Sequence, residues 1–104
     1  MKKLTDSQAV ACLRELPQWT LEPEAGAITR EFLLLDFAQA FAFMTQIALA
    51  AETRNHHPEW SNVYRKVRMT WTTHDAGGLT EKDIEMALLC DRVFASYVVN
   101  TASP

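Results

Sequence analysis

A long amphipathic helix dominates the fold signal of this sequence. Asp36 is a good N-cap, and residues 37–54 place apolar side chains at helical spacing. These side chains are Phe37, Ala40, Phe41, Met44, Ile47, Ala48 and Ala51. Because Phe43, Leu49 and Ala50 widen the apolar surface beyond one stripe, the helix needs cover on more than one side. We expect it to pack on a sheet and also on a neighbouring chain, with the short first helix as the alternative second cover.

The segments before this helix predict a short helix and a β-hairpin. Thr5 or Asp6 can cap a helix over residues 7–16, which must end before Pro17 because a residue preceding proline avoids the helical region. Residues 19–21 and 28–35 then read as strands, joined by a turn rich in Glu, Pro and Gly.

After Pro58 the periodicity changes from helical to alternating. From Val63 to Thr73 apolar side chains face one way and polar side chains the other, which predicts one strand of an antiparallel sheet with one covered face. Thr80 follows a glycine turn and can cap the last helix, with Asp83 as its capping-box partner. The order of elements predicts an α+β fold, in which helices pack on one face of an antiparallel sheet.

Length, charge and cysteine content restrict the function. The chain has 104 residues and is expected to form a single domain over residues 1–104, small enough to gain from self-association. A net charge of -3 provides no basic field for nucleic acid, and no apolar run is long enough to cross a bilayer. Cys12 and Cys90 form no CxxC pair, and residues 1–4 do not resemble a secretory leader, so we expect free thiols and a cytoplasmic protein.

All three histidines, His56, His57 and His74, occur within a short part of the chain together with aromatic side chains. Pro58 must end the long helix near Asn55, which places the adjacent His56 and His57 at a helix terminus. In an unbroken helix Glu52 would lie one turn before His56 and could orient its ring. Imidazoles that titrate near neutral pH suit proton transfer on a flat heterocycle.

Simpler interpretations exist for each of these residues. Adjacent histidines can serve as a polar C-cap, and Asp83 as a helix cap. A zinc or iron site has the right ligand types, but the H-E-x-x-H spacing is absent, so we expect no metal. Nucleophilic catalysis is disfavoured because neither cysteine neighbours a histidine in sequence.

Taken together, these residues resemble the pterin-4a-carbinolamine dehydratases, a family also described as dimerisation cofactors of a homeodomain transcription factor. The resemblance is carried by Glu52, the run His56-His57-Pro58, Tyr64, Thr73-His74, Gly78-Leu79-Thr80 and Asp83. It implies a four-stranded antiparallel sheet with helices on one face, assembled as a homodimer or a homotetramer.

The resemblance also implies an activity: loss of water from a 4a-hydroxytetrahydropterin to give the quinonoid dihydropterin, without a metal or organic cofactor. Expelling hydroxide from C4a requires a proton for the leaving oxygen and removal of a proton from the ring nitrogen, and histidines can do both. By resemblance, His56 and His57 lie at the reacting centre and His74 on the far side of the pterin. We expect all three to face a cavity and not the core.

Five further residues are expected by resemblance to bind the substrate or hold the histidines. Glu52 would orient His56, and the rings of Pro58, Trp60 and Trp19 would wall the pterin, with Asp83 as the last member of the set. Two alternatives remain open: a non-enzymatic scaffold that binds an unknown protein partner through the long helix, and a dehydratase-like protein in another pterin pathway, such as one that serves the molybdenum cofactor.

Overall fold

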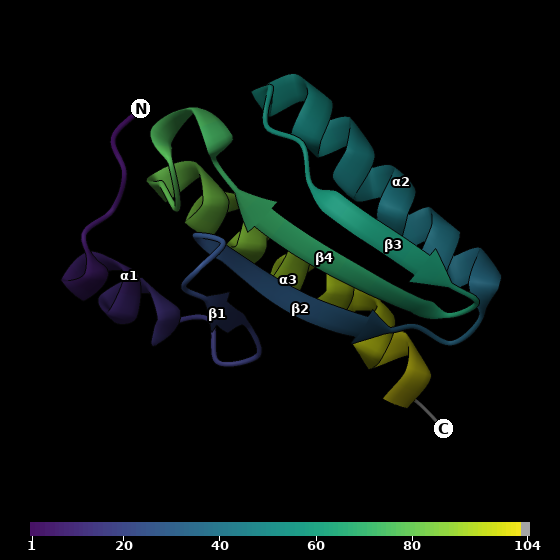
Figure 1. The fold of residues 1–104 in the computed structure, drawn as a ribbon. Coiled ribbons are helices and arrows are strands. Elements are labelled where there is room, and N and C mark those ends of the chain that lie inside the picture. Colours follow the sequence, from purple (N-terminus) through teal and green to yellow (C-terminus); the bar gives the residue numbers. More distant parts are fainter. Residues whose placement is uncertain (103–104) are drawn as a thin grey trace.

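A computed structural model describes residues 1–102, and their side chains as far as residue 97. Along the chain the elements are α1 (Asp6–Leu13), β1 (Thr20–Glu22), β2 (Ala27–Leu33), α2 (Phe37–Arg54), β3 (Glu59–Val63), β4 (Lys66–Thr72), the 3-10 turn η1 (His74–Ala76) and α3 (Glu81–Ala102). The strands form one antiparallel sheet in the order β1-β2-β4-β3 (Figure 1). The predicted α+β fold is therefore confirmed.

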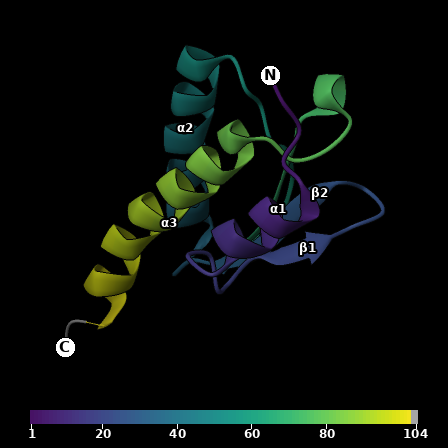
Figure 2. The same ribbon diagram turned by 90° about the vertical axis from the view of Figure 1, so that its left-hand side faces the viewer.

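One face of the sheet is covered by helices and the other is open. Strand pairing sets Ile28 opposite Trp71 and Phe32 opposite Val67, so these four side chains point to the same face. All four are fully buried, and they share a core with Ala9 of α1 and with side chains of α2 and α3. Figure 2 shows the three helices gathered along the sheet.

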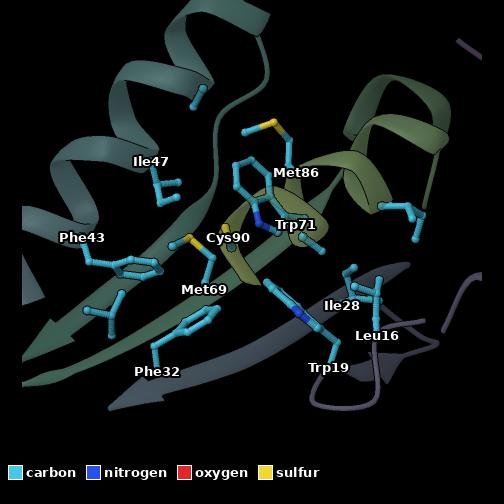
Figure 3. Close-up of a cluster of buried hydrophobic side chains, with 14 of the residues drawn as sticks. Leu16, Trp19, Ile28, Phe32, Phe43, Ile47, Met69, Trp71, Met86 and Cys90 are labelled. Carbon is cyan, nitrogen blue, oxygen red and sulfur yellow. The ribbon is translucent and has the colours of Figure 1, made fainter. Parts of the chain in front are cut away.

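Aromatic rings fill the centre of this core (Figure 3). The ring of Phe32 lies 4.8 Å from that of Phe43 and 5.0 Å from that of Phe94, measured between centroids. Trp19 completes the group at 5.8 Å from Phe32, edge to face. Strand β2 is thereby fixed against both long helices, which is the framework that carries the site.

Helix α2 begins and ends where the sequence predicts. Asp36 caps it by accepting a hydrogen bond from the N–H of Gln39 at 2.8 Å, and Asn55 ends it in the left-handed conformation with φ 52°. Its second side is covered by α3 and not by α1. Phe41 and Leu49 on the remaining side stay exposed.

No helix among the described residues has the length and apolar character needed to span a bilayer.

The strand expected from Val63 to Thr73 is wrong as a single element, because the chain reverses at Tyr64 and Arg65. Val63 pairs with Lys66 at the end of β3, on the open face and 68% exposed, instead of lying in the core beside Val67. Tyr64 takes a φ of 53°, a left-handed backbone conformation that bulky side chains seldom adopt. The side chain of Asn62 supports the turn by donating to the carbonyls of Tyr64 and Lys66.

Smaller shifts affect the N-terminal elements. Helix α1 ends at Leu13, three residues early, since Arg14, Glu15 and Leu16 donate to carbonyls three residues back and tighten the chain into turns. Strand β1 starts at Thr20, one residue later than expected, which leaves Trp19 outside the strand and in the core.

Candidate active site

The left-handed turn at Asn55 sends two adjacent histidines in different directions. Helix α2 ends there, and the N–H of His56 still donates to the carbonyl of Ala51 at 3.0 Å. After this turn the His56 ring points into the protein, where 12% of its side chain is exposed, whereas His57 points outward with 56% exposed.

His56 is held between a carboxylate and an aromatic ring. Its Nε2 lies 2.6 Å from Oδ1 of Asp83, whose side chain has no exposed surface. Its imidazole stacks on the indole of Trp71, with centroids 5.7 Å apart and 18° between the planes. The expectation that all three histidines face a cavity and not the core therefore needs correction, because His56 borders both.

The expected pairing of Glu52 with His56 is also wrong. Glu52 Oε1 lies 2.8 Å from Nε2 of His57 instead. The reason is the backbone of Asn55: one left-handed residue between the helix and His56 removes the one-turn spacing on which that expectation rested. Asp83, predicted as a capping residue and pterin contact, takes the place next to His56 and also accepts the N–H of Thr80 at 2.9 Å.

In the tight loop after β4, the side chains of Thr73 and His74 point to opposite sides. Thr73 and Gly78 form an isolated antiparallel bridge, which closes residues 73–78 into a loop that contains η1. On the solvent side of this loop, His74 Nε2 lies 2.6 Å from Oε2 of Glu59, and the His74 side chain is 78% exposed. Inside it, the Thr73 hydroxyl donates to Asp83 at 2.7 Å. Two residues adjacent in sequence thus make contacts on opposite sides of one loop: Thr73 binds the buried Asp83, and His74 binds the exposed Glu59.

The β1–β2 hairpin turn rests against this loop. Thr72 donates its hydroxyl to the carbonyl of Gly26 at 2.7 Å. Gly26 has a φ of 59°, and a Cβ built there would lie 2.7 Å from the Cα of Gly78. Only glycine permits this approach of two backbones.

The predicted aromatic residues lie in different places. Trp60 is partly buried and packs against the core, and Pro58 is also partly buried. Trp19 is 6% exposed and donates its indole N–H to Asp91 at 2.9 Å, so its ring is part of the core. Tyr64 lies at the far end of β3 from Glu59, the partner of His74.

An open cavity of about 230 Å³ borders His56 and reaches Asn55, Thr73, Asp75 and Lys82. Larger cavities, about 350 Å³ beside α1 and about 440 Å³ on the open sheet face, have no histidine in their walls. Lys82 donates to the carbonyl of Arg54 at 2.7 Å, which ties the start of α3 to the end of α2.

Glu59, Thr73 and Thr80 have contacts at the site that the sequence does not predict. Glu59 is the first residue of β3, and its contact with His74 cannot be predicted unless β3 is recognised as a separate strand. The sequence predicts Thr80 as a helix cap and as part of the family motif, and in the structure its hydroxyl lies 2.9 Å from that of Thr73. The signal for Glu59 was available, since Asn62 before Tyr64 is typical of a turn.

Metal-ligating side chains and thiols are the remaining groups of the chain with chemistry of their own. Within residues 1–102, no three His, Cys, Asp or Glu side chains come together as the ligands of a metal ion would. Cys90 lies in the core beside Trp71 (Figure 3), and burial raises its pKa to about 12, so at neutral pH it is an unreactive thiol.

Comparison with known proteins extends over nearly the whole chain. Residues 2–93 match the family model described as Pterin 4 alpha carbinolamine dehydratase. A protein of Burkholderia multivorans, provisionally named a pterin-4-alpha-carbinolamine dehydratase, is 52% identical over 93 residues, which cover 89% of this chain and 91% of the relative. A protein of Rhodopseudomonas palustris with the same provisional name is 48% identical over 95 residues, covering 91% and 94%.

A solved structure agrees with these sequence relatives. The crystal structure described as a transcriptional coactivator/pterin dehydratase from Brucella melitensis superimposes with a TM-score of 0.85 at 44% identity, covering 88% of this chain and 98% of that one. The similarity includes the segments that position the histidines, since the family match contains α2, both strands after it and most of α3. The resemblance seen in the sequence is confirmed, and the chain belongs to the pterin 4 alpha carbinolamine dehydratase family.

Proposed function

We propose that this protein eliminates water from a 4a-hydroxytetrahydropterin and that its three histidines carry the protons. The observation behind this proposal is that every histidine has its Nε2 within 2.8 Å of a carboxylate oxygen: His56 on Asp83, His57 on Glu52 and His74 on Glu59. A carboxylate orients an imidazole and stabilises its cationic form, as proton transfer requires. Family membership supplies the substrate class.

The reaction needs one proton donor and one proton acceptor. A histidine in its cationic form gives a proton to the 4a-hydroxyl, which leaves as water, and a neutral histidine takes the proton of the ring nitrogen. The electron pair of that N–H bond forms the new carbon–nitrogen double bond of the quinonoid product. Because His57 and His74 are exposed whereas His56 borders a cavity, the substrate would lie over the surface between α2 and η1.

Pro58 and Trp60 follow the histidine pair in sequence and are both partly exposed, and we assign them to the wall of the pterin site. Glu52 and Glu59 are assigned to the orientation of His57 and His74.

Turnover of a synthetic 4a-hydroxytetrahydropterin in excess chelator tests the proposal. Wild-type protein should accelerate the dehydration without added metal, and each single change His56→Ala, His57→Ala or His74→Ala should lower kcat by about one to three orders of magnitude. The double change of His56 and His57 should cost more than either single change. Folded variants with wild-type turnover would show that the histidines are dispensable.

We also propose that the protein is a homo-oligomer. Six exposed apolar side chains surround the β3–β4 turn and the start of α2, at one end of the molecule (Figure 1). They are Leu33, Leu35, Phe37, Phe41, Val63 and Tyr64, each at least 50% exposed. An exposed apolar patch of this kind on a small domain is typical of an interface between identical subunits. We therefore assign it to contact with a second copy of this chain.

Sedimentation at micromolar concentration tests this assembly. The wild type should sediment as a dimer or tetramer, and Phe41→Ser should shift it toward monomer. Val10→Ser, a change at an exposed apolar side chain of α1, is the matched control and should leave the assembly intact. A monomeric wild type would contradict the proposal and return interest to a different protein partner.

A cytoplasmic location completes the proposal. Cys12 and Cys90 are both free thiols, a state that the reducing cytoplasm maintains. Cell fractionation tests the location.

A further inference from the structure

Asp83 is the buried centre of a hydrogen-bond chain that ends on His56. Its side chain has no exposed surface, so both oxygens need partners within the protein. Oδ1 faces Nε2 of His56 at 2.6 Å. Oδ2 accepts from the hydroxyl of Thr73 at 2.7 Å and from the N–H of Thr80 at 2.9 Å.

The direction of each hydrogen bond in this chain follows from the carboxylate. An ionised carboxylate only accepts, so the single hydroxyl proton of Thr73 is committed to Asp83. The contact of 2.9 Å between the hydroxyls of Thr73 and Thr80 must then be donated by Thr80. The protons therefore point from Thr80 to Thr73 and from Thr73 to Asp83, and the carboxylate in turn receives Nε2–H of His56.

The backbone around the two hydroxyls is held in place. The bridge between Thr73 and Gly78 fixes one end of the loop, and Thr80 is fully buried at the start of α3. Thr73, just after β4, and Thr80, just before α3, thereby bind one carboxylate oxygen from two sides. These contacts orient the carboxylate, and the ring of His56 stacks on Trp71 with 18° between the planes.

We propose that Thr73 and Thr80 are positioning residues for the dehydration, because their hydroxyl chain holds Asp83 so that it fixes the tautomer of His56. With Nε2 carrying the proton given to Asp83, Nδ1 is the ring nitrogen that exchanges a proton with the substrate. The inference rests on the proposed role of His56 in turnover. It adds two residues that transmit their effect through Asp83 without touching the reacting atoms.

A matched pair of variants separates the hydroxyl from the shape of the side chain. Thr73→Val keeps the branched shape and removes the donor, whereas Thr73→Ser keeps the donor. The valine variant should lose about tenfold in kcat, as expected when a hydrogen bond to a charged group disappears, with KM unchanged. The serine variant should recover most of this loss. Equal loss in both variants would mean that packing, and not the hydroxyl, matters.

Ring NMR gives a readout that packing alone would not move. The chain has 3 histidines, so a sample labelled with ¹⁵N-histidine shows only three ring systems, which the variants His57→Gln and His74→Gln assign. We expect a slowly exchanging proton on Nε2 of His56 in the wild type and in Thr73→Ser. In Thr73→Val this signal should broaden through exchange with water. An unchanged signal together with wild-type kcat in Thr73→Val would overturn the inference.

Two further measurements keep the test decisive. If Thr73→Val fails to fold, Thr80→Val removes the next donor in the chain and should weaken the same Nε2 signal. If His56→Ala retains full turnover, the proposed function of His56 fails. If His56→Ala loses turnover while the folded threonine variants keep both turnover and signal, only the positioning role fails.

Discussion

The imidazole of His56 lies nearly parallel to the indole of Trp71, with 5.7 Å between the ring centroids. Trp71 is fully buried and belongs to β4, one of the two interior strands, so the core itself forms one wall behind this histidine. His57 and His74 have no such backing and lie largely in solvent. The three histidines are therefore unequal in their importance for folding.

His56→Ala should lower the free energy of unfolding by about 1–3 kcal/mol, because it removes a partner of a buried carboxylate and leaves a gap against Trp71. His57→Ala and His74→Ala should each change it by less than about 0.5 kcal/mol. Urea denaturation of the three variants checks this order. Equal stabilities of the three variants would show that the contact between His56 and Asp83 makes no net contribution to the free energy of unfolding.

Substitutions at Asn55 should act on the histidines through the backbone. Asn55→Gly keeps the left-handed turn and should retain both turnover and stability. Asn55→Val places a β-branched residue at a φ of 52° and should cost about 1–2 kcal/mol and most of the activity. Thermal unfolding and steady-state kinetics on the same samples test the pair, and a fully active valine variant would show that the turn is not required.

Glu59→Gln should weaken the contribution of His74. The change replaces the carboxylate that lies 2.6 Å from the ring, and kcat should fall by less than tenfold because the pair is exposed. In a double-mutant cycle with His74→Ala the two losses should not add. Glu24→Gln, in the β1–β2 turn, is the matched control and should behave as wild type.

Stability should decline in alkaline solution because of Cys90. Burial raises its pKa from 9.0 to about 12, so above pH 9 the unfolded chain loses a proton that the folded chain keeps. The stability is intact below pH 9 and falls between 9 and 12, by at most about 1.4 kcal/mol per pH unit. Cys90→Ala should show a shallower decline in pH-dependent denaturation, and Cys12→Ala should retain the wild-type slope. Parallel curves for all three proteins would contradict this assignment.

The sequence predicts those elements best whose signals are local. Helix α2 was bounded correctly because Asp36 and Asn55 act through their own backbone neighbours. The reversal at Tyr64 is weakly marked in the sequence, because no glycine lies there and Val63 and Val67 on either side of the turn are an even number of residues apart, as in one continuous strand.

The sequence singles out the three histidines and Asp83, but it does not predict which side chains pair with them. Glu52 was assigned to His56 on the assumption of a continuous helix, and a single left-handed residue reassigned it to His57. The contact of His56 with Asp83 joins residues 27 positions apart, and depends on where α3 packs against α2. No local spacing rule contains that information.

Gly26 of the β1–β2 turn packs closely against Gly78, so this turn helps to fix the position of the loop that carries His74, although the two segments are distant in sequence. A designer who grafts the loop over residues 73–78 onto another scaffold would have to transplant the β1–β2 turn with it. The two form one structural cassette.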